Sequence, residues 1–352
     1  MLEPVQIILR SISFVLGLGL VLRTVFSAVK TFVLPRSAPD ALTGLVFRTT
    51  RKVFDLILLG AREYKQRDSI MAYFAPISLI ALLPVWLSLM TVGYAGIYWA
   101  LGVESWWLAF RISGSSLLTL GYASGEYLGS TIVEFTEGTM GLMLVALLIA
   151  YLPSIYSAFS RRESAVTLLE VRAGNPPSAV EMIQRYQRNH GLEQLGEQWE
   201  SWEAWFAELN ESHTSLAALV FFRSPHGNLS WVTASGTILD AASLTLSSLD
   251  LPYDPRAALC IRAGYLALRS IADYFRIPFN PAPYYPEEPI SISRQEFEQA
   301  LDNMVDSGVA IKQDREKAWQ DFAGWRVNYD NVLLTLAKLT MAPPAMWISD
   351  ES

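Results

Sequence analysis

The stretch that decides the fold is Ser105 to Glu163, which reads SWWLAFRISGSSLLTLGYASGEYLGSTIVEFTEGTMGLMLVALLIAYLPSIYSAFSRRE. Its first part, Ser105 to Leu118, is rich in Trp, Leu and Ser and predicts a short helix whose negative C-terminal end lies near Thr119. A Gly-rich loop then leads to Ser130, where an apolar stretch begins that runs to Phe159 and stops at a pair of arginines. The predicted order is short helix, loop and long apolar helix.

Within this stretch, Thr119-Leu120-Gly121-Tyr122-Ala123 resembles the T-V-G-Y-G selectivity filter of the potassium-channel family. In that family the carbonyl oxygens of the filter replace the water shell of a dehydrated cation, so most filter residues act through backbone geometry. The flanking segments resemble the family's pore helix, loop and inner helix in order and spacing. The resemblance implies potassium as the permeant ion, no further cofactor, and a homotetramer around one axis.

The string departs from the family pattern at its ends. Leu120 replaces the usual Val or Ile, and Ala123 replaces the final Gly. Ser124 stands where the family commonly has an acidic residue, with Glu126 nearby, and the resemblance places both at the outer mouth. The family's last position is commonly open to glycine, and a Cβ there costs on the order of 1 kcal/mol if φ is positive. We therefore expect a cation pore with weakened potassium selectivity.

Composition agrees with a membrane protein that carries a large soluble part. Hydrophobic residues make up 51% of the chain, and its mean hydropathy is positive. The net charge of −7 argues against nucleic acid as a partner. The single cysteine, Cys260, excludes an intrachain disulfide and a cysteine-built zinc site. The composition therefore predicts that the chain is partly embedded in a lipid bilayer.

Apolar segments predict the spans. No charged residue lies between Asp68 and Glu104, a run longer than the roughly 20 residues that cross a bilayer, and we expect the outer helix there. Ser130 to Phe159 predicts the inner helix. Val5 to Leu34 is interrupted by Arg10, Arg23 and Lys30. We favour a third span with snorkelling basic residues there, with an interfacial helix as the alternative and a cleaved signal peptide as a weaker one.

Basic residues beside the spans predict the orientation. Before the outer helix stand Arg36, Arg48, Arg51, Lys52, Arg62, Lys65 and Arg67. We therefore expect the filter outside a plasma membrane and the C-terminal half in the cytoplasm. The alternation of apolar clusters with basic residues over Ala41 to Arg67 predicts an interfacial helix on anionic lipid, or simply a solvated basic anchor. The expected domains are a membrane segment (1–36), this basic helix (37–68), the pore domain (69–161) and a helical cytoplasmic domain (162–352).

Two carboxylates in the inner helix need an explanation, because a bare carboxylate in hydrocarbon costs several kcal/mol. Glu134 and Glu137 share one helix face at a spacing of three, and Arg111 on the short helix lies at a comparable depth. By resemblance we expect Arg111 to form a salt bridge with one of them and brace the filter. The alternative places both glutamates in the outer vestibule, where they would only concentrate cations.

A gate in the inner helix is expected at one of a few helix-weakening residues. Gly138 and Gly141 lie where inner helices often bend, and Pro153 removes a backbone hydrogen bond near the cytoplasmic end. We expect the gate at Pro153. The alternative is that this proline only shapes packing.

The half from Arg162 onward predicts a helical domain. Helices are expected over Ser178–Leu209, Ser230–Leu249, Pro255–Phe275 and Glu316–Leu339, and Ser293 to Glu296 has the form of a capping box. Trp199, Trp202 and Trp205 are three apart, a spacing typical of a core or a subunit interface. No nucleotide, calcium or zinc motif is present, so the pattern assigns no ligand, and the lone His213 is a weak metal candidate.

The sequence thus predicts an all-α membrane protein with a potassium-channel-like pore and a helical cytoplasmic domain, and not an enzyme. One alternative is a non-conducting scaffold or receptor with a channel-like fold, which Leu120 and Ala123 permit. The other is a membrane-tethered enzyme, against which the missing nucleophile, metal and phosphate motifs count.

Overall fold

The computed structural model describes residues 4–34 and 40–348. It is 74% helix, and apart from a single β-bridge between Leu249 and Ile311 the described residues contain no extended pairing. This confirms the all-helical fold class. The chain forms two compact units, whose described residues lie within 1–57 and 73–156 for the first and within 58–72 and 157–352 for the second. The expected boundary at residues 36 and 37, and Arg36 itself, lie outside the described residues.

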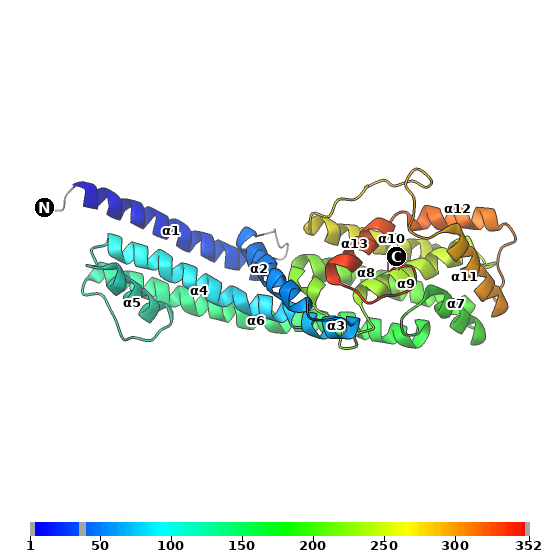
Figure 1. Ribbon diagram of the computed structural model, residues 1–352, viewed down its shortest axis with the longest axis horizontal. Coiled ribbons are helices and arrows are strands. Elements are labelled where there is room, and N and C mark those ends of the chain that lie inside the picture. Colours follow the sequence, from blue (N-terminus) through cyan, green and yellow to red (C-terminus); the bar gives the residue numbers. More distant parts are fainter. Residues whose placement is uncertain (1–3, 35–39, 349–352) are drawn as a thin grey trace. The chain divides into compact units, whose positions relative to one another are not determined.

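The first unit contains the apolar helices (Figure 1). They are α1 (Pro4–Phe32), α2 (Ala41–Leu58), α4 (Phe74–Ala100), α5 (Trp106–Leu117) and the first part of α6 (Leu128–Ala173). Among the described residues, three helices are long and apolar enough to cross a membrane: α1, α4 with the helix before it, and α6. The three segments in which spans were predicted therefore form helices of suitable length and composition.

Helix α1 lies along α4 with the two backbones in close contact (Figure 1). A Cβ on Gly17 would lie 2.5 Å from the carbonyl oxygen of Gly93, so only glycine fits at that crossing. The hydroxyl of Ser13 donates to the carbonyl of Gly96 at 3.0 Å. The outward side chains of α1, such as Val15 and Leu16, are apolar and about two-thirds exposed. This packing suits a lipid-facing span better than an interfacial helix, which would present a polar face.

The segment expected as one basic helix, 37–68, is two helices. Helix α2 ends at Leu58, a turn follows at Gly60, and Glu63 is extended before α3 (Tyr64–Met71) begins. Glycine is a poor helix former, so Gly60 favours the break at this point. Only α2 belongs to the first unit, whereas α3 belongs to the second.

The second unit is a helical domain around one hydrophobic core. Besides α3 and the end of α6, it contains α7 (Ala179–Arg188), η1 (Leu192–Gln194), α8 (Leu195–Ser215), η2 (Ala217–Phe221), α9 (Trp231–Ser247), α10 (Pro255–Tyr274), α11 (Arg294–Asp306), α12 (Arg315–Arg326) and α13 (Asp330–Thr340). Almost every residue of α9 is buried, which makes it the central helix. The tryptophans of α8 are also buried, so the core interpretation of that stripe is confirmed.

Two long helices predicted in this unit are each broken in two. The segment 178–209 is interrupted after α7, because His190 takes a left-handed conformation (φ 51°) beside Gly191. The segment 316–339 is interrupted after α12, where the Asn328 amide donates to the carbonyls of Gly324 and Trp325 and so closes the helix end. The capping box at Ser293 and Glu296 is confirmed.

Candidate functional site

The filter-like string leaves α5 directly. Ser105 caps the start of α5 by accepting a hydrogen bond from the Leu108 amide, and the helix ends at Leu117. The amide of Thr119 donates to the carbonyl of Ser116 at 3.0 Å, and that of Leu120 to the carbonyl of Ser115 at 2.8 Å. These bonds close the last turn of the short helix and attach the string to it.

The backbone of the string is free on its acceptor side. Among the described residues, no hydrogen bond is accepted by a carbonyl oxygen of Thr119 to Ala123. Thr119 (φ 55°) and Gly121 (φ 70°) both take left-handed conformations, which fold the segment out of helix. The string therefore carries a run of backbone carbonyls with no protein partner inside the described part of the chain.

Ala123 is not strained in the way its position in the family suggested. It is absent from the residues with positive φ, and its amide donates to the Ser115 hydroxyl at 3.0 Å. The left-handed residue that carries a Cβ is Thr119 instead, and such a conformation costs on the order of 1 kcal/mol. The departure from glycine at Ala123 is thus accommodated by the backbone.

The side chains of the string and of the outer loop point largely to the surface of this single chain. Leu120 and Tyr122 are exposed, as are Ser124 and Glu126. The guanidinium of Arg111 lies 5.7 Å from the centroid of the Tyr122 ring, within the range of a cation–π contact.

Glu137 is fully buried and held by the two helices that pack against α6. Its carboxylate accepts a hydrogen bond from the hydroxyl of Tyr98 on α4 at 2.8 Å and another from the hydroxyl of Ser113 on α5. The Ser113 hydroxyl also lies 3.1 Å from the carbonyl oxygen of Thr91. Glu137 therefore connects α4, α5 and α6 behind the short helix that bears the string.

The expected salt bridge of Arg111 with Glu134 or Glu137 does not form. Arg111 has neither glutamate within ion-pair distance in the described structure, because it turns toward Tyr122. Glu134 instead accepts from the amide of Gly125 at 2.6 Å and so holds the outer loop. The support of the string comes from hydroxyl groups and a buried carboxylate, not from a guanidinium.

Gly138 and Gly141 lie where α6 packs against the end of α5. A Cβ on Gly141 would lie 2.2 Å from the carbonyl oxygen of Leu117, and one on Gly138 would lie 3.3 Å from that of Ser116. Small residues here allow α6 to approach the C-terminal end of α5. Pro153 lies inside α6 on its exposed side, and the helix continues to Ala173.

Replacing Gly141 by alanine is expected to push α6 away from the end of α5, because the new methyl group overlaps a backbone oxygen that cannot rotate aside. Overpacking of this kind costs about 1–3 kcal/mol. We expect a lower thermal unfolding midpoint of the detergent-solubilised protein. Gly129→Ala is the matched control on the same helix, since nothing lies within 4 Å of its added Cβ. Equal midpoints for the two variants would contradict the packing role.

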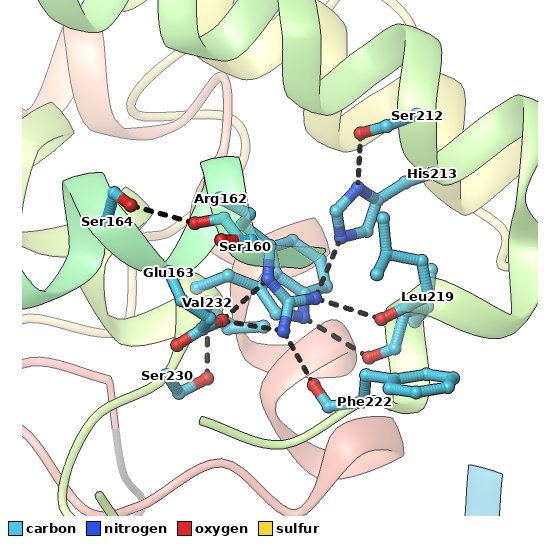
Figure 2. A network of polar contacts seen from close by, with 12 residues as sticks. Ser160, Arg162, Glu163, Ser164, Ser212, His213, Leu219, Phe222, Ser230 and Val232 are labelled. Carbon is cyan, nitrogen blue, oxygen red and sulfur yellow. Dashed lines mark hydrogen bonds and ion pairs between the residues drawn. The ribbon is translucent and has the colours of Figure 1, made fainter. Parts of the chain in front are cut away.

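At its other end α6 carries a buried arginine (Figure 2). The Arg162 side chain is 3% exposed, forms an ion pair with Glu163, and donates to the carbonyls of Leu219 (2.9 Å) and Phe222 (2.7 Å). The sequence showed Arg162 only as one of two arginines that follow the inner helix. The structure adds that the segment around η2 presents backbone carbonyls that its guanidinium fork satisfies. Arg162 thus fixes the end of α6 to its own domain.

His213 belongs to the same buried cluster. Its Nε2 lies 3.3 Å from the Arg162 guanidinium and its Nδ1 lies 3.2 Å from the Ser212 hydroxyl (Figure 2). Burial, and then the Arg162 charge, lower the pKa of His213 well below its usual value, so the ring is neutral. Within the described residues, no group of three potential ligands gathers around it.

A second buried ion cluster fixes the centre of the C-terminal domain. Arg326 is fully buried; it forms ion pairs with Asp240 on α9 and with Asp330 (2.7 Å), and it donates to the carbonyl of Trp347 at 2.6 Å. The Tyr329 hydroxyl donates to Asp240 at 2.9 Å. Burial raises the pKa of Asp240, and the adjacent Arg326 opposes that rise. No sequence motif marked these residues.

Sequence reasoning also missed Tyr98, Ser113 and Ser115 as supports of the string. A usable signal existed, because polar residues inside otherwise apolar segments must find partners when they are buried. Ser113, Ser115 and Ser116 form such a group on α5. What the sequence did not reveal is that Ser113 meets Glu137 and that Ser115 accepts from the amide of Ala123.

Comparisons with family models, with curated proteins and with solved structures find no match for this chain.

Proposed function

We propose that this protein is a cation channel, with potassium as its main ion, that conducts through a homotetrameric pore lined by the backbone carbonyls of Thr119 to Ala123. The observation that carries the proposal is that none of these carbonyl oxygens accepts a hydrogen bond within the described residues. Carbonyl groups free of protein partners are what a filter needs to replace the water shell of a cation.

The support around the string is consistent with this function. A filter must hold its shape when ions leave, so its backbone needs fixed attachments. The amides of Thr119, Leu120 and Ala123 all donate to α5, and α5 is connected to α4 and α6 through Glu137. In this proposal Arg111 has no bracing role, whereas Ser115 and Glu137 do.

One copy of the chain cannot surround an ion, which is why the proposal includes four copies. The exposed apolar side chains of α6, among them Phe135, Leu142 and Ile149, supply the surface that neighbouring copies or lipid would cover. The orientation proposed from the basic residues of α2 puts the string outside a plasma membrane and the C-terminal domain in the cytoplasm.

The test is the reversal potential of the purified protein in a planar bilayer, with potassium on one side and sodium on the other. We expect a potential shifted toward the potassium equilibrium value, and a loss of that shift in Thr119→Ala. Current that reverses near zero in both proteins would show an unselective pore. Silence in every condition would overturn the proposal in favour of a non-conducting scaffold or receptor.

A further inference from the structure

Helix α3 has an unusual position in the chain. It stands directly before α4, with only Ala72 and Tyr73 between them, yet its contacts place it in the second compact unit. Ala72 and Tyr73 keep right-handed helical dihedrals, so α3 runs into α4 almost without a break, while its tertiary contacts lie in the second unit. Those contacts decide what the C-terminal domain can do to the start of α4.

One arginine contacts two side chains of α3. Arg223, which is 9% exposed, forms an ion pair with Asp68 of α3, and its Nη2 donates to the hydroxyl of Tyr64 at 2.8 Å. The same guanidinium donates to the carbonyls of Thr340 (2.8 Å) and Met341 (2.7 Å). We call these residues the Arg223 cluster. Its arginine binds α3 and the end of α13 at the same time.

The carbonyl partners of Arg223 are well suited to a cation. Thr340 is the last residue of α13, and Met341 follows it as a left-handed cap (φ 52°). The C-terminal end of a helix carries a partial negative charge and unsatisfied carbonyls, which a guanidinium stabilises. Asp68 adds a full negative charge and is 16% exposed, so solvent screens this ion pair only in part.

The loop after Arg223 is shaped to this contact. A Cβ on Gly227 would lie 2.8 Å from the Asp68 carboxylate, so a larger residue would displace α3. Tyr64 also forms part of the wall of a cleft of about 980 Å³, together with side chains of α11 and of the segment after α13. A molecule bound in that cleft would touch a residue of the Arg223 cluster.

We propose that the Arg223 cluster is a coupling device: it fixes α3 to the end of α13, so that a change in the C-terminal domain is passed through α3 to the start of α4. Its meaning for gating rests on the proposed function, because α4 is the expected outer helix of the pore. The physical coupling itself does not depend on conduction.

The test compares amide hydrogen exchange of the full chain in detergent between wild type and Arg223→Met. We expect exchange in α3 to rise about 10- to 100-fold, and exchange in the first turns of α4 to rise several-fold. Arg223→Lys keeps the positive charge but not the forked guanidinium group, so its exchange rates should lie between those of wild type and Arg223→Met. Arg161→Met is the matched control, because its ion pair with Glu208 lies in the same unit and is about half exposed.

Unchanged exchange in α3 would overturn the proposal, and so would a rise confined to α3 that leaves the start of α4 protected. Global loss of protection in Arg223→Met would show unfolding; Tyr64→Phe and Asp68→Asn then replace it, and each must raise exchange in both segments. If the wild-type protein conducts, the open probability of Arg223→Met should differ from that of wild type by at least several-fold. If wild type does not conduct, the exchange result still decides the coupling.

Discussion

Replacing Arg326 by alanine is expected to destabilise the C-terminal domain strongly. The substitution leaves Asp240 and Asp330 buried without a cation, and breaking a buried pair by removing one partner costs about 3–5 kcal/mol. Domains of this kind are stable by only about 5–15 kcal/mol in total. Chemical unfolding of the full chain in detergent, followed by tryptophan fluorescence, should show a much lower midpoint.

A matched control is Arg256→Ala, because Arg256 forms ion pairs at the surface and its side chain is 40% exposed. Exposed ion pairs contribute little because water screens them, so the unfolding midpoint of this variant should hardly move. Arg326→Lys keeps the positive charge but loses the forked guanidinium group. Its unfolding midpoint should therefore lie between those of wild type and Arg326→Ala. If Arg326→Ala unfolds at the same denaturant concentration as Arg256→Ala, the buried cluster does not stabilise the domain.

Replacing Glu137 by alanine is expected to loosen α5 and the string it carries. The hydroxyl of Tyr98 would lose this acceptor, and an unsatisfied buried donor costs about 1–3 kcal/mol, whereas the Ser113 hydroxyl keeps the carbonyl of Thr91 within reach. Glu137→Gln keeps one acceptor oxygen and should therefore lose less stability than Glu137→Ala. Thermal unfolding in detergent measures the stability, and exchange at the amides of 119–123 measures the effect on the string.

Glu126→Ala provides the comparison for Glu137, because it removes a carboxylate from an exposed position in the outer loop. Its midpoint should stay near that of wild type. In a double-mutant cycle, Tyr98→Phe and Glu137→Gln should be coupled by about 0.5–3 kcal/mol, since the two side chains are in direct contact. Additive effects would show that Glu137 does not act through Tyr98.

What could be predicted from the sequence was local in origin. Ser105 caps α5 where the sequence placed a short helix, and the capping box at Ser293 is present, because a cap depends on a few neighbouring residues. The three long apolar helices followed in the same way from the length of uncharged stretches.

What could not be predicted depended on partners far apart in the chain. Glu137 was correctly singled out as a carboxylate that needs a partner, but the partner assigned to it was Arg111 and not Tyr98 or Ser113. Hydrophobic periodicity says which face of a helix is buried, not which residue of another helix it meets. The breaks at His190 and Asn328 were missed because periodic apolar residues continue across both.

The burial of Arg162 has a consequence for how the chain is made. Its carbonyl partners at Leu219 and Phe222 are synthesised more than fifty residues later, so a ribosome-bound chain ending shortly after α6 holds this arginine without them. In the proposed orientation the side chain would then be available to anionic headgroups, as an orientation signal requires. One residue can therefore direct insertion first and secure the finished fold afterwards, and a substitution that spares either role alone would separate errors of topology from errors of folding.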